Sequence, residues 1–202
     1  MIERQCDRDL PGRDNHWKLF LAVDAVLAPL KVLYPACRFD VSPSLVFPDV
    51  TYVDDGSDVA AFFGDIEGVL DIVAECSTAP QDAVFRYIRS ACSRLVLPSA
   101  RYDLVISLDS RPVVESCARY LKKGGWFLTH PASQDAMTLA QDPTFTLAAV
   151  VTPSLGEYRL RKLDRKPSRL PAGPSNPSTG SGADRQHDLI AEASALVYAH
   201  SG

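Results

Sequence analysis

The segment Arg101–His130 contains one complete unit of strand, crossover helix and following strand. Within it, Tyr102–Leu108 is a nearly continuous apolar run, which is typical of a strand buried on both faces of a parallel sheet. Arg111–Lys122 then changes to helical spacing, with apolar side chains on one side and charged side chains on the other. Gly124 and Gly125 follow, and glycine readily adopts the left-handed conformation found just beyond helix ends. This segment predicts an α/β fold with a parallel sheet.

The rest of the chain repeats this alternation of strands and helical stretches. The predicted strands are residues 31–34, 50–53, 84–88, 102–108, 126–129, 146–151 and 158–162. Parallel strands joined through helices form a doubly wound sheet with right-handed crossovers. The last two strands have no helix between them, and residues 153–156 can form a hairpin turn there. We therefore expect a doubly wound, mostly parallel seven-stranded sheet with an antiparallel edge hairpin.

Composition divides the chain into three parts. Residues 13–166 are expected to form one α/β domain, which begins with a helix at residues 13–28. Residues 167–183 are rich in proline, glycine and serine and are predicted to be a flexible linker. Residues 184–199 have an apolar stripe at helical spacing, which predicts an amphipathic C-terminal helix. Such a helix either packs on the domain or binds a partner, including a second copy of the chain.

Charge and cysteine content exclude several classes of protein. The net charge of −4 and the isoelectric point near 5.5 disfavour nucleic-acid binding. The longest apolar stretch, Leu19–Leu33, is interrupted by charged residues and a proline, so it is not expected to cross a membrane. The five cysteines include no CxxC pair and no cluster with histidine, which favours a reduced, cytoplasmic protein without a metal site. We therefore expect a cytoplasmic protein whose partner is a small molecule.

Candidate site residues stand where three of the predicted strands end. Asp54 and Asp55 follow the second strand, Ser107 and Asp109 the fourth, and His130 the fifth. Ligands of open α/β sheets bind at the carboxyl ends of the strands, so these side chains are expected to share one crevice. Asp109 is a general base, a group that holds a substrate cation, or the cap of the next helix. His130 is either a proton acceptor or an ordinary loop residue. The sequence has no GxSxG, GxxxxGK or HExxH motif, which disfavours hydrolases, NTPases and zinc enzymes.

In this order of elements and these motifs, residues 30–162 resemble the class I S-adenosylmethionine-dependent methyltransferases. The most specific match is CARYLKKGGWFLTH, which is similar to the stretch before the fifth strand of many such enzymes, with Lys123 in the place of a proline. The resemblance implies their fold, in which alternating parallel strands are followed by an antiparallel hairpin. It also implies S-adenosylmethionine as the cofactor.

The cofactor residues of that family carry over in part. The family's first-strand loop is rich in glycine, whereas other residues occupy it here, and the resemblance assigns them to the methionine end of the cofactor: Tyr34, Pro35, Ala36 and Cys37. The family's acid at the tip of the second strand accepts hydrogen bonds from the ribose hydroxyls, which implies that role for Asp54, with Asp55 beside it. The alternative role for Asp54 is to cap a loop. Ser107 is expected in the same crevice, and the family's acid after the third strand is absent.

Two functions remain open at this point. The first is a methyltransferase that uses S-adenosylmethionine to modify a small molecule. The second is a degenerate, non-catalytic domain of the same fold that serves as a binding or assembly scaffold, and the glycine-free loop favours it. An open crevice beside Pro35, Asp54 and Asp109 would favour the methyltransferase, whereas a crevice whose adenosine space is filled by Tyr34, Phe39 or Phe62 would favour the scaffold.

Overall fold

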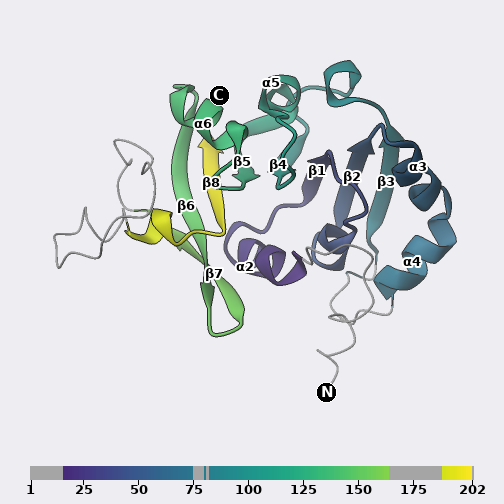
Figure 1. Ribbon diagram of the computed structural model, residues 1–202, viewed down its shortest axis with the longest axis horizontal. Coiled ribbons are helices and arrows are strands. Elements are labelled where there is room, and N and C mark those ends of the chain that lie inside the picture. Colours follow the sequence, from purple (N-terminus) through teal and green to yellow (C-terminus); the bar gives the residue numbers. More distant parts are fainter. Residues whose placement is uncertain (1–15, 75–79, 81, 164–187, 202) are drawn as a thin grey trace.

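The computed structural model describes residues 16–74, 80, 82–163 and 188–201, so the predicted linker at 167–183 lies outside the described residues. Eight strands of the described part form one sheet in the order β3-β2-β1-β4-β5-β8-β6-β7 (Figure 1). They are β1 (Lys31–Pro35), β2 (Asp49–Asp54), β3 (Val84–Arg89), β4 (Tyr102–Ser107), β5 (Leu121–Thr129), β6 (Phe145–Ser154), β7 (Glu157–Lys162) and β8 (Ala195–His200). All run parallel except β7 and β8, and β6 and β7 form an antiparallel edge hairpin. The predicted doubly wound, mostly parallel sheet is confirmed, with one additional strand.

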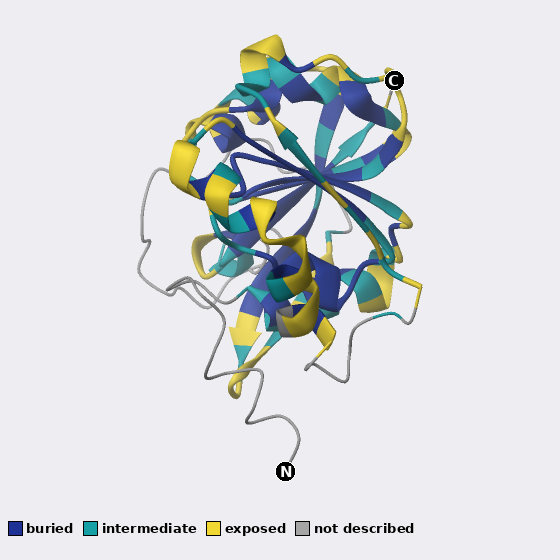
Figure 2. Ribbon diagram, turned by 90° about the vertical axis from the view of Figure 1, so that its right-hand side faces the viewer, coloured by how far each residue is buried: buried dark blue, intermediate teal, exposed yellow. Residues whose placement is uncertain are grey.

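Helices cover both faces of this sheet. They are α2 (Trp17–Leu27), α3 (Ser57–Gly64), α4 (Ile66–Ala74), α5 (Val114–Cys117) and α6 (Gln134–Gln141), with 3-10 helices η1 (Ser42–Leu45), η2 (Cys92–Arg94) and η3 (Ala118–Tyr120). Side chains of α2, α3 and α4, among them Phe20 and Phe63, pack on one face, and those of α5 and α6, among them Cys117 and Leu139, pack on the other. Figure 2 shows the buried strands between partly exposed helices. None of the helices in the described residues has the length and apolar character needed to cross a membrane.

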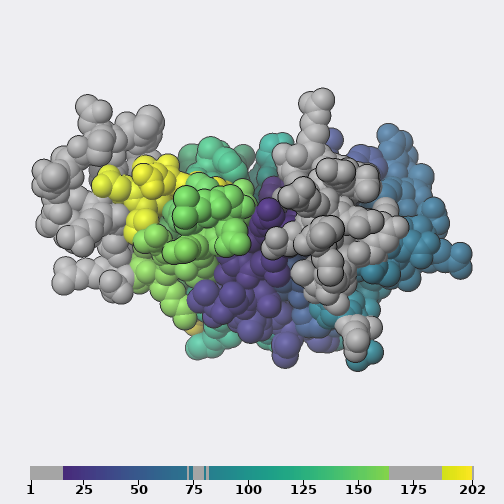
Figure 3. Space-filling model, turned by 90° about the horizontal axis from the view of Figure 1, so that it is seen from below, coloured from purple at the N-terminus to yellow at the C-terminus, as the bar shows by residue number. Residues whose placement is uncertain are grey.

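Helix α2 also packs against the edge hairpin. The partly buried side chains of Tyr158 and Leu160 on β7 pack against the same apolar cluster as Trp17 and Phe20 of α2. Figure 3 shows α2, in purple, beside the green β6–β7 hairpin. This contact brings the start of α2 close to the edge strands, although the two segments are far apart in the sequence.

The C-terminal segment differs from the predicted helix at 184–199. Residues 188–191 form one helical turn, but Ala195–His200 form β8, which pairs with β5 on one side and β6 on the other (Figure 1). Val197 is buried in the core of one face and Leu196 in the core of the other. A strand covered on both faces has a short apolar run that resembles a buried helix in sequence. The sheet therefore includes a C-terminal strand beyond the predicted domain end at residue 166.

The predicted crossover helix at Arg111–Lys122 is also shorter than expected. Helix α5 and the following 3-10 turn end at Tyr120, and β5 begins at the next residue. Gly124, with a φ of 77°, lies in β5 where the pairing with β4 shifts register. A Cβ atom on Gly125 would lie 3.0 Å from the backbone oxygen of Asp103. The two glycines therefore belong to a β-bulge, where an extra stretch of chain must pass close to its neighbour, and not to a helix end.

Candidate functional site

A crevice opens at the carboxyl edge of the sheet, where the strand order reverses between β1 and β4 and the loops after these strands diverge. The Asp54 pocket, of about 320 Å³, lies beyond β2 and β3. The middle pocket, of about 530 Å³, lies beyond β1, and the His130 pocket, of about 620 Å³, lies between α2, β5 and β7. Ala36 lines the first two pockets and Asp109 lines the last two. The three pockets therefore adjoin along one edge, and the crevice is open.

Asp54 ends β2 and is a buried carboxylate, with 3% of its surface exposed. Its Oδ1 atom accepts the backbone N–H of Gly56 at 2.9 Å. Its Oδ2 atom accepts the backbone N–H of Arg38 at 3.2 Å and Nη2 of Arg111 at 2.5 Å. Burial opposes ionisation most strongly, but the hydrogen bonds from Gly56, Arg111 and Arg38 together lower the pKa of Asp54 below its ordinary value. The residue is therefore ionised and already has hydrogen-bond donors.

Arg111 follows β4 and reaches across the crevice to the acids of β2. Besides its bond to Asp54, its Nη1 atom lies 3.6 Å from Oδ1 of Asp55, and its Nε atom lies 3.8 Å from Oδ1 of Asp109. Three carboxylates therefore surround one guanidinium, which leaves this part of the crevice without excess positive charge. Such a site suits a neutral or cationic ligand better than a phosphate.

The loop after β3 completes the Asp54 pocket. Ser90 and Cys92 line it at the place where the acid of the resembled family is absent. A hydrogen bond with the buried Cys117 thiol lowers the pKa of Cys92, and the nearby Arg111 guanidinium lowers it further, against the opposing effect of burial. Cys92 is partly exposed. It is therefore the most reactive of the three cysteines that the structure describes.

The loop after β1 has a left-handed backbone without any glycine. Ala36 has a φ of 56° and Arg38 a φ of 51°. This conformation costs an ordinary residue roughly 1–2 kcal/mol, so the surrounding structure must hold it in place. Cys37, between them, lines the middle pocket but is only 1% exposed. Burial, and then the nearby Asp54 and Asp40 carboxylates, raise the pKa of Cys37 well above its ordinary value, so it is not a nucleophile.

Two of the predicted residues, Pro35 and Ser107, are buried beneath the crevice. Pro35 lies beside Val53 in the sheet and lines none of the three pockets. Ser107 is 2% exposed and donates a hydrogen bond to Oδ2 of Asp135 at 2.6 Å. Asp135 also accepts the backbone N–H groups of the residues that begin α5, Val113 at 3.0 Å and Val114 at 3.1 Å. Ser107 therefore helps to hold the start of α5.

Asp109 lies where it was expected, at the boundary between the middle and His130 pockets. Its Oδ1 atom accepts the backbone N–H of Arg111 at 3.1 Å and the hydroxyl of Ser110 at 3.2 Å. Its Oδ2 atom lies 3.7 Å from Nη1 of Arg38. The carboxylate therefore caps the turn after β4 through Oδ1 as well as lining the crevice.

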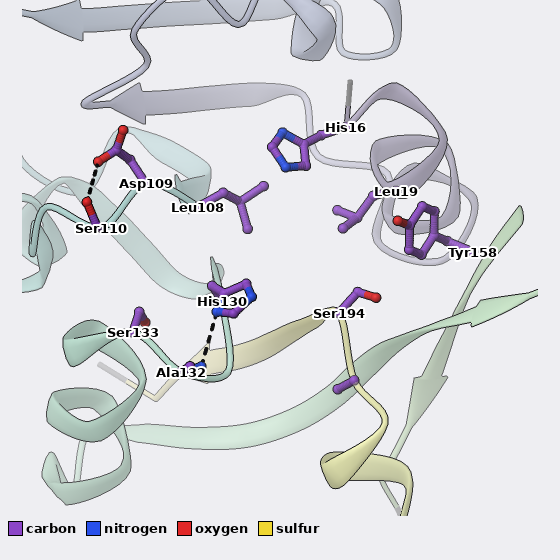
Figure 4. Close-up of a pocket in the computed structure, with 11 residues that line it drawn as sticks. His16, Leu19, Leu108, Asp109, Ser110, His130, Ala132, Ser133, Tyr158 and Ser194 are labelled. Atoms are coloured by element: carbon purple, nitrogen blue, oxygen red, sulfur yellow. Dashed lines mark hydrogen bonds between the residues drawn. The ribbon is translucent and has the colours of Figure 1, made fainter. Parts of the chain in front are cut away.

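Two histidines from different elements line the His130 pocket (Figure 4). His130 follows β5, and its Nδ1 atom accepts the backbone N–H of Ala132 at 3.2 Å. His16 precedes α2, and its Nδ1 atom lies 3.0 Å from Oδ2 of Asp40. The hydroxyl of Tyr34, which lines the middle pocket, donates to the same Oδ2 atom at 3.1 Å. Among the described residues, no group of three metal-ligating side chains is present.

His16 and Arg111 were not among the predicted site residues. His16 is separated from Asp40 by 24 residues, and Arg111 from Asp54 by 57 residues. Neither pair has a local sequence pattern, because each forms only when the loops of the sheet edge come together. For Arg111, the sequence did contain one indication of a place in the site, because this residue directly follows the expected turn after β4.

No family model matches the chain, and a search of curated proteins found no match. Several solved structures are similar to it. A putative O-methyltransferase from Klebsiella pneumoniae has a TM-score of 0.54 and 10% identity over 100% of this chain and 87% of that protein. The tRNA (m1A58) methyltransferase TrmI from Aquifex aeolicus has a TM-score of 0.53 and 10% identity over 99% of this chain and 75% of that protein.

The YcgJ protein from Bacillus subtilis has a TM-score of 0.43 and 18% identity, and the match covers 62% of this chain and 55% of that protein. The chain thus spans little more than half the length of that structure. The identities are low, so the likenesses concern the fold. The chain has the methyltransferase-like Rossmann fold that the sequence resemblance implied.

Proposed function

We propose that the crevice binds S-adenosylmethionine and that the protein transfers its methyl group to a small molecule. The observation that carries this proposal is Asp54, a buried carboxylate at the tip of β2 that opens on a pocket at the switch point of a methyltransferase-fold sheet. A carboxylate has two oxygens with which to accept hydrogen bonds from neighbouring ribose hydroxyls. The acidic surroundings of Arg111 also suit a cofactor that has no phosphate.

The residues present fit such a cofactor in the following way. The Asp54 pocket would hold the adenosine half, with Ser90 and Cys92 near the base. The middle pocket would hold the methionine half against the backbone of Ala36 and Arg38, whose positive φ angles are of the kind that glycine adopts most readily. When bound, S-adenosylmethionine supplies a methyl group on a positively charged sulfur. The protein's own contribution is then to orient the two reactants and to exclude water.

A second function, a non-catalytic scaffold of the same fold, is favoured by one specific contact. Nη2 of Arg111 donates a hydrogen bond of 2.5 Å to Oδ2 of Asp54, the carboxylate that a ribose would need. If this contact is permanent, the adenosine half has no place to bind. The open crevice argues for the first function and the Arg111 contact for the second, so a binding experiment separates them.

The experiment is calorimetric titration with S-adenosylhomocysteine, the product of methyl transfer. We expect binding and, at a hundredfold excess over Kd, a gain of about 2.7 kcal/mol in the free energy of unfolding. Asp54→Asn keeps the size of the side chain and one oxygen acceptor but loses the charge, and it should weaken binding by about ten- to a hundredfold. The matched control is Asp55→Asn, because Asp55 also lines the pocket and contacts Arg111 but is 46% exposed.

Circular dichroism of both variants checks that they are folded. No binding of S-adenosylhomocysteine or S-adenosylmethionine at millimolar concentration would overturn the methyltransferase proposal in favour of the scaffold. Equal loss of affinity in Asp54→Asn and Asp55→Asn would leave cofactor binding in place but remove Asp54 from its proposed role.

A further inference from the structure

The His130 pocket has a chemical character of its own. Its walls include the apolar side chains of Leu19 and Leu108 and the ring of Tyr158, and its polar groups include the two imidazoles (Figure 4). It adjoins the middle pocket through Asp109, so a molecule in it would lie next to the end of the crevice assigned to the methionine half of the cofactor. The following inference rests on the proposed function and concerns the methyl acceptor.

Hydrogen bonds to Asp40 assign the position of the proton on His16. The carboxylate of Asp40 accepts the hydroxyl of Tyr34 at 3.1 Å, the backbone N–H of Ser42 at 2.9 Å, and the hydroxyl of Ser42. A carboxylate with three donors around it is an acceptor only, so the Nδ1 atom of His16, 3.0 Å away, must be the donor. In the neutral ring, Nε2 of His16 is then without a proton and is basic.

His130 carries its proton on the opposite nitrogen. A backbone N–H can only donate, so the Nδ1 atom of His130, which faces the N–H of Ala132 at 3.2 Å, must be the acceptor. The neutral ring then has its proton on Nε2, and this nitrogen points away from Ala132 (Figure 4). His130 is therefore prepared to donate a hydrogen bond, not to remove a proton. The two imidazoles of one cavity have complementary roles.

We propose that the His130 pocket binds a small phenol, that His16 is the general base that removes its hydroxyl proton, and that His130 donates a hydrogen bond to the same oxygen. A base is useful only to an acceptor that must lose a proton before or during attack. A phenol hydroxyl has an ordinary pKa of about 10, so its proton passes to an imidazole more readily than the proton of an aliphatic alcohol does. The apolar walls and the Tyr158 ring suit the aromatic part of such a molecule.

The proton and electrons balance in this step. The phenol proton moves to Nε2 of His16, and the resulting imidazolium is stabilised by Asp40 through Nδ1. The phenolate oxygen forms a bond to the methyl carbon as the bond from that carbon to the sulfonium sulfur breaks, and the sulfur keeps the electron pair. The imidazolium then releases its proton to water. Asp40 is a positioning residue here, because it acts through His16.

The experiment uses 4-nitrophenol, whose anion absorbs visible light, with the full-length protein and no cofactor. At a pH at which the free probe is largely protonated, we expect bound probe to show the absorbance of the anion. His16→Gln should abolish that absorbance, because the amide cannot accept the proton. His130→Gln should weaken probe binding by several-fold and retain the anion. His200→Gln is the matched control, because His200 lines none of the three pockets and contacts the backbone of Lys122.

Three results would overturn the proposal. They are no binding of the probe at millimolar concentration, binding without the anion absorbance, and anion absorbance that persists in folded His16→Gln. Because S-adenosylhomocysteine is not present, this readout is independent of the cofactor titration. Absence of cofactor binding with a normal probe signal would contradict the proposed function, whereas normal cofactor binding without the probe signal would contradict the inference about the His130 pocket.

Discussion

Asp54 accepts three hydrogen bonds, and they differ in how easily a ligand can replace them. The donors from Gly56 and Arg38 are backbone N–H groups, which the loops after β2 and β1 hold in place. The donor from Arg111 is the end of a flexible side chain that is 46% exposed. Ion pairs with such exposed groups contribute little, because water screens them. A ribose hydroxyl can therefore compete for the Asp54 carboxylate only at the position that Arg111 occupies.

This competition leads to a prediction for Arg111→Met, which keeps an unbranched side chain but removes the charge. We expect S-adenosylhomocysteine to bind about two- to fivefold more tightly, since the ligand no longer displaces an ion pair worth at most about 1 kcal/mol. Calorimetry on the variant measures the change. Arg86→Met is the control, because the Arg86 side chain is 47% exposed, pairs with Asp49 and lines none of the three pockets. Weaker binding to Arg111→Met would mean that Arg111 contacts the ligand directly.

Single residues of the site were predictable only where a strand end places them. Asp54, Asp109 and His130 follow strands that are evident as local apolar runs, and the carboxyl ends of parallel strands meet at one edge. The orientation of each side chain was not predictable, because it depends on donors from other loops. His16 is the clearest example, since its proton position follows from Asp40, a residue on another element.

Among the elements, the strands that the sequence predicted well are those with strong local patterns, such as β1, β2 and β4. The residues of β8 were predicted as part of a helix. They form a strand by pairing with β5 and β6, which are distant in the sequence, and no local pattern indicates that pairing. The bulge in β5 was missed for a similar reason. Gly124 and Gly125 are compatible with a helix end. In the fold, Gly124 is needed for its φ of 77°, and Gly125 is needed because the backbone oxygen of Asp103 lies close to it.

The position of β8 predicts its energetic importance. Leu196 is fully buried in the centre of the sheet, whereas Leu155 is fully exposed at the tip of the β6–β7 hairpin. Leu196→Ala should therefore lower the free energy of unfolding by about 2–5 kcal/mol, and Leu155→Ala should change it by less than about 0.5 kcal/mol. Urea unfolding followed by circular dichroism compares the two. Similar small effects would contradict the placement of β8 inside the sheet.

At the scale of the whole molecule, the crevice has two ends made by different parts of the chain. The Asp54 end is formed by loops after β1 to β4, which belong to the doubly wound half of the sheet. The His130 end is enclosed by α2, the edge strand β7 and the residues before β8. The contact between α2 and the β6–β7 hairpin thus helps to form the His130 pocket, since it brings His16 and Tyr158 to one cavity (Figures 3 and 4).

Because the two ends are separate, two ligands should protect different residues. Cys92 lines the Asp54 pocket, is partly exposed and has a lowered pKa through its contact with Cys117, so iodoacetamide should alkylate it before the buried Cys37 and Cys117. At a hundredfold excess over Kd, S-adenosylhomocysteine should slow alkylation of Cys92 at least about tenfold, because little free protein remains. The phenol probe should not slow it, because its pocket lies at the other end. Peptide mass spectrometry measures both rates, and equal protection by the two ligands would contradict this division of the crevice.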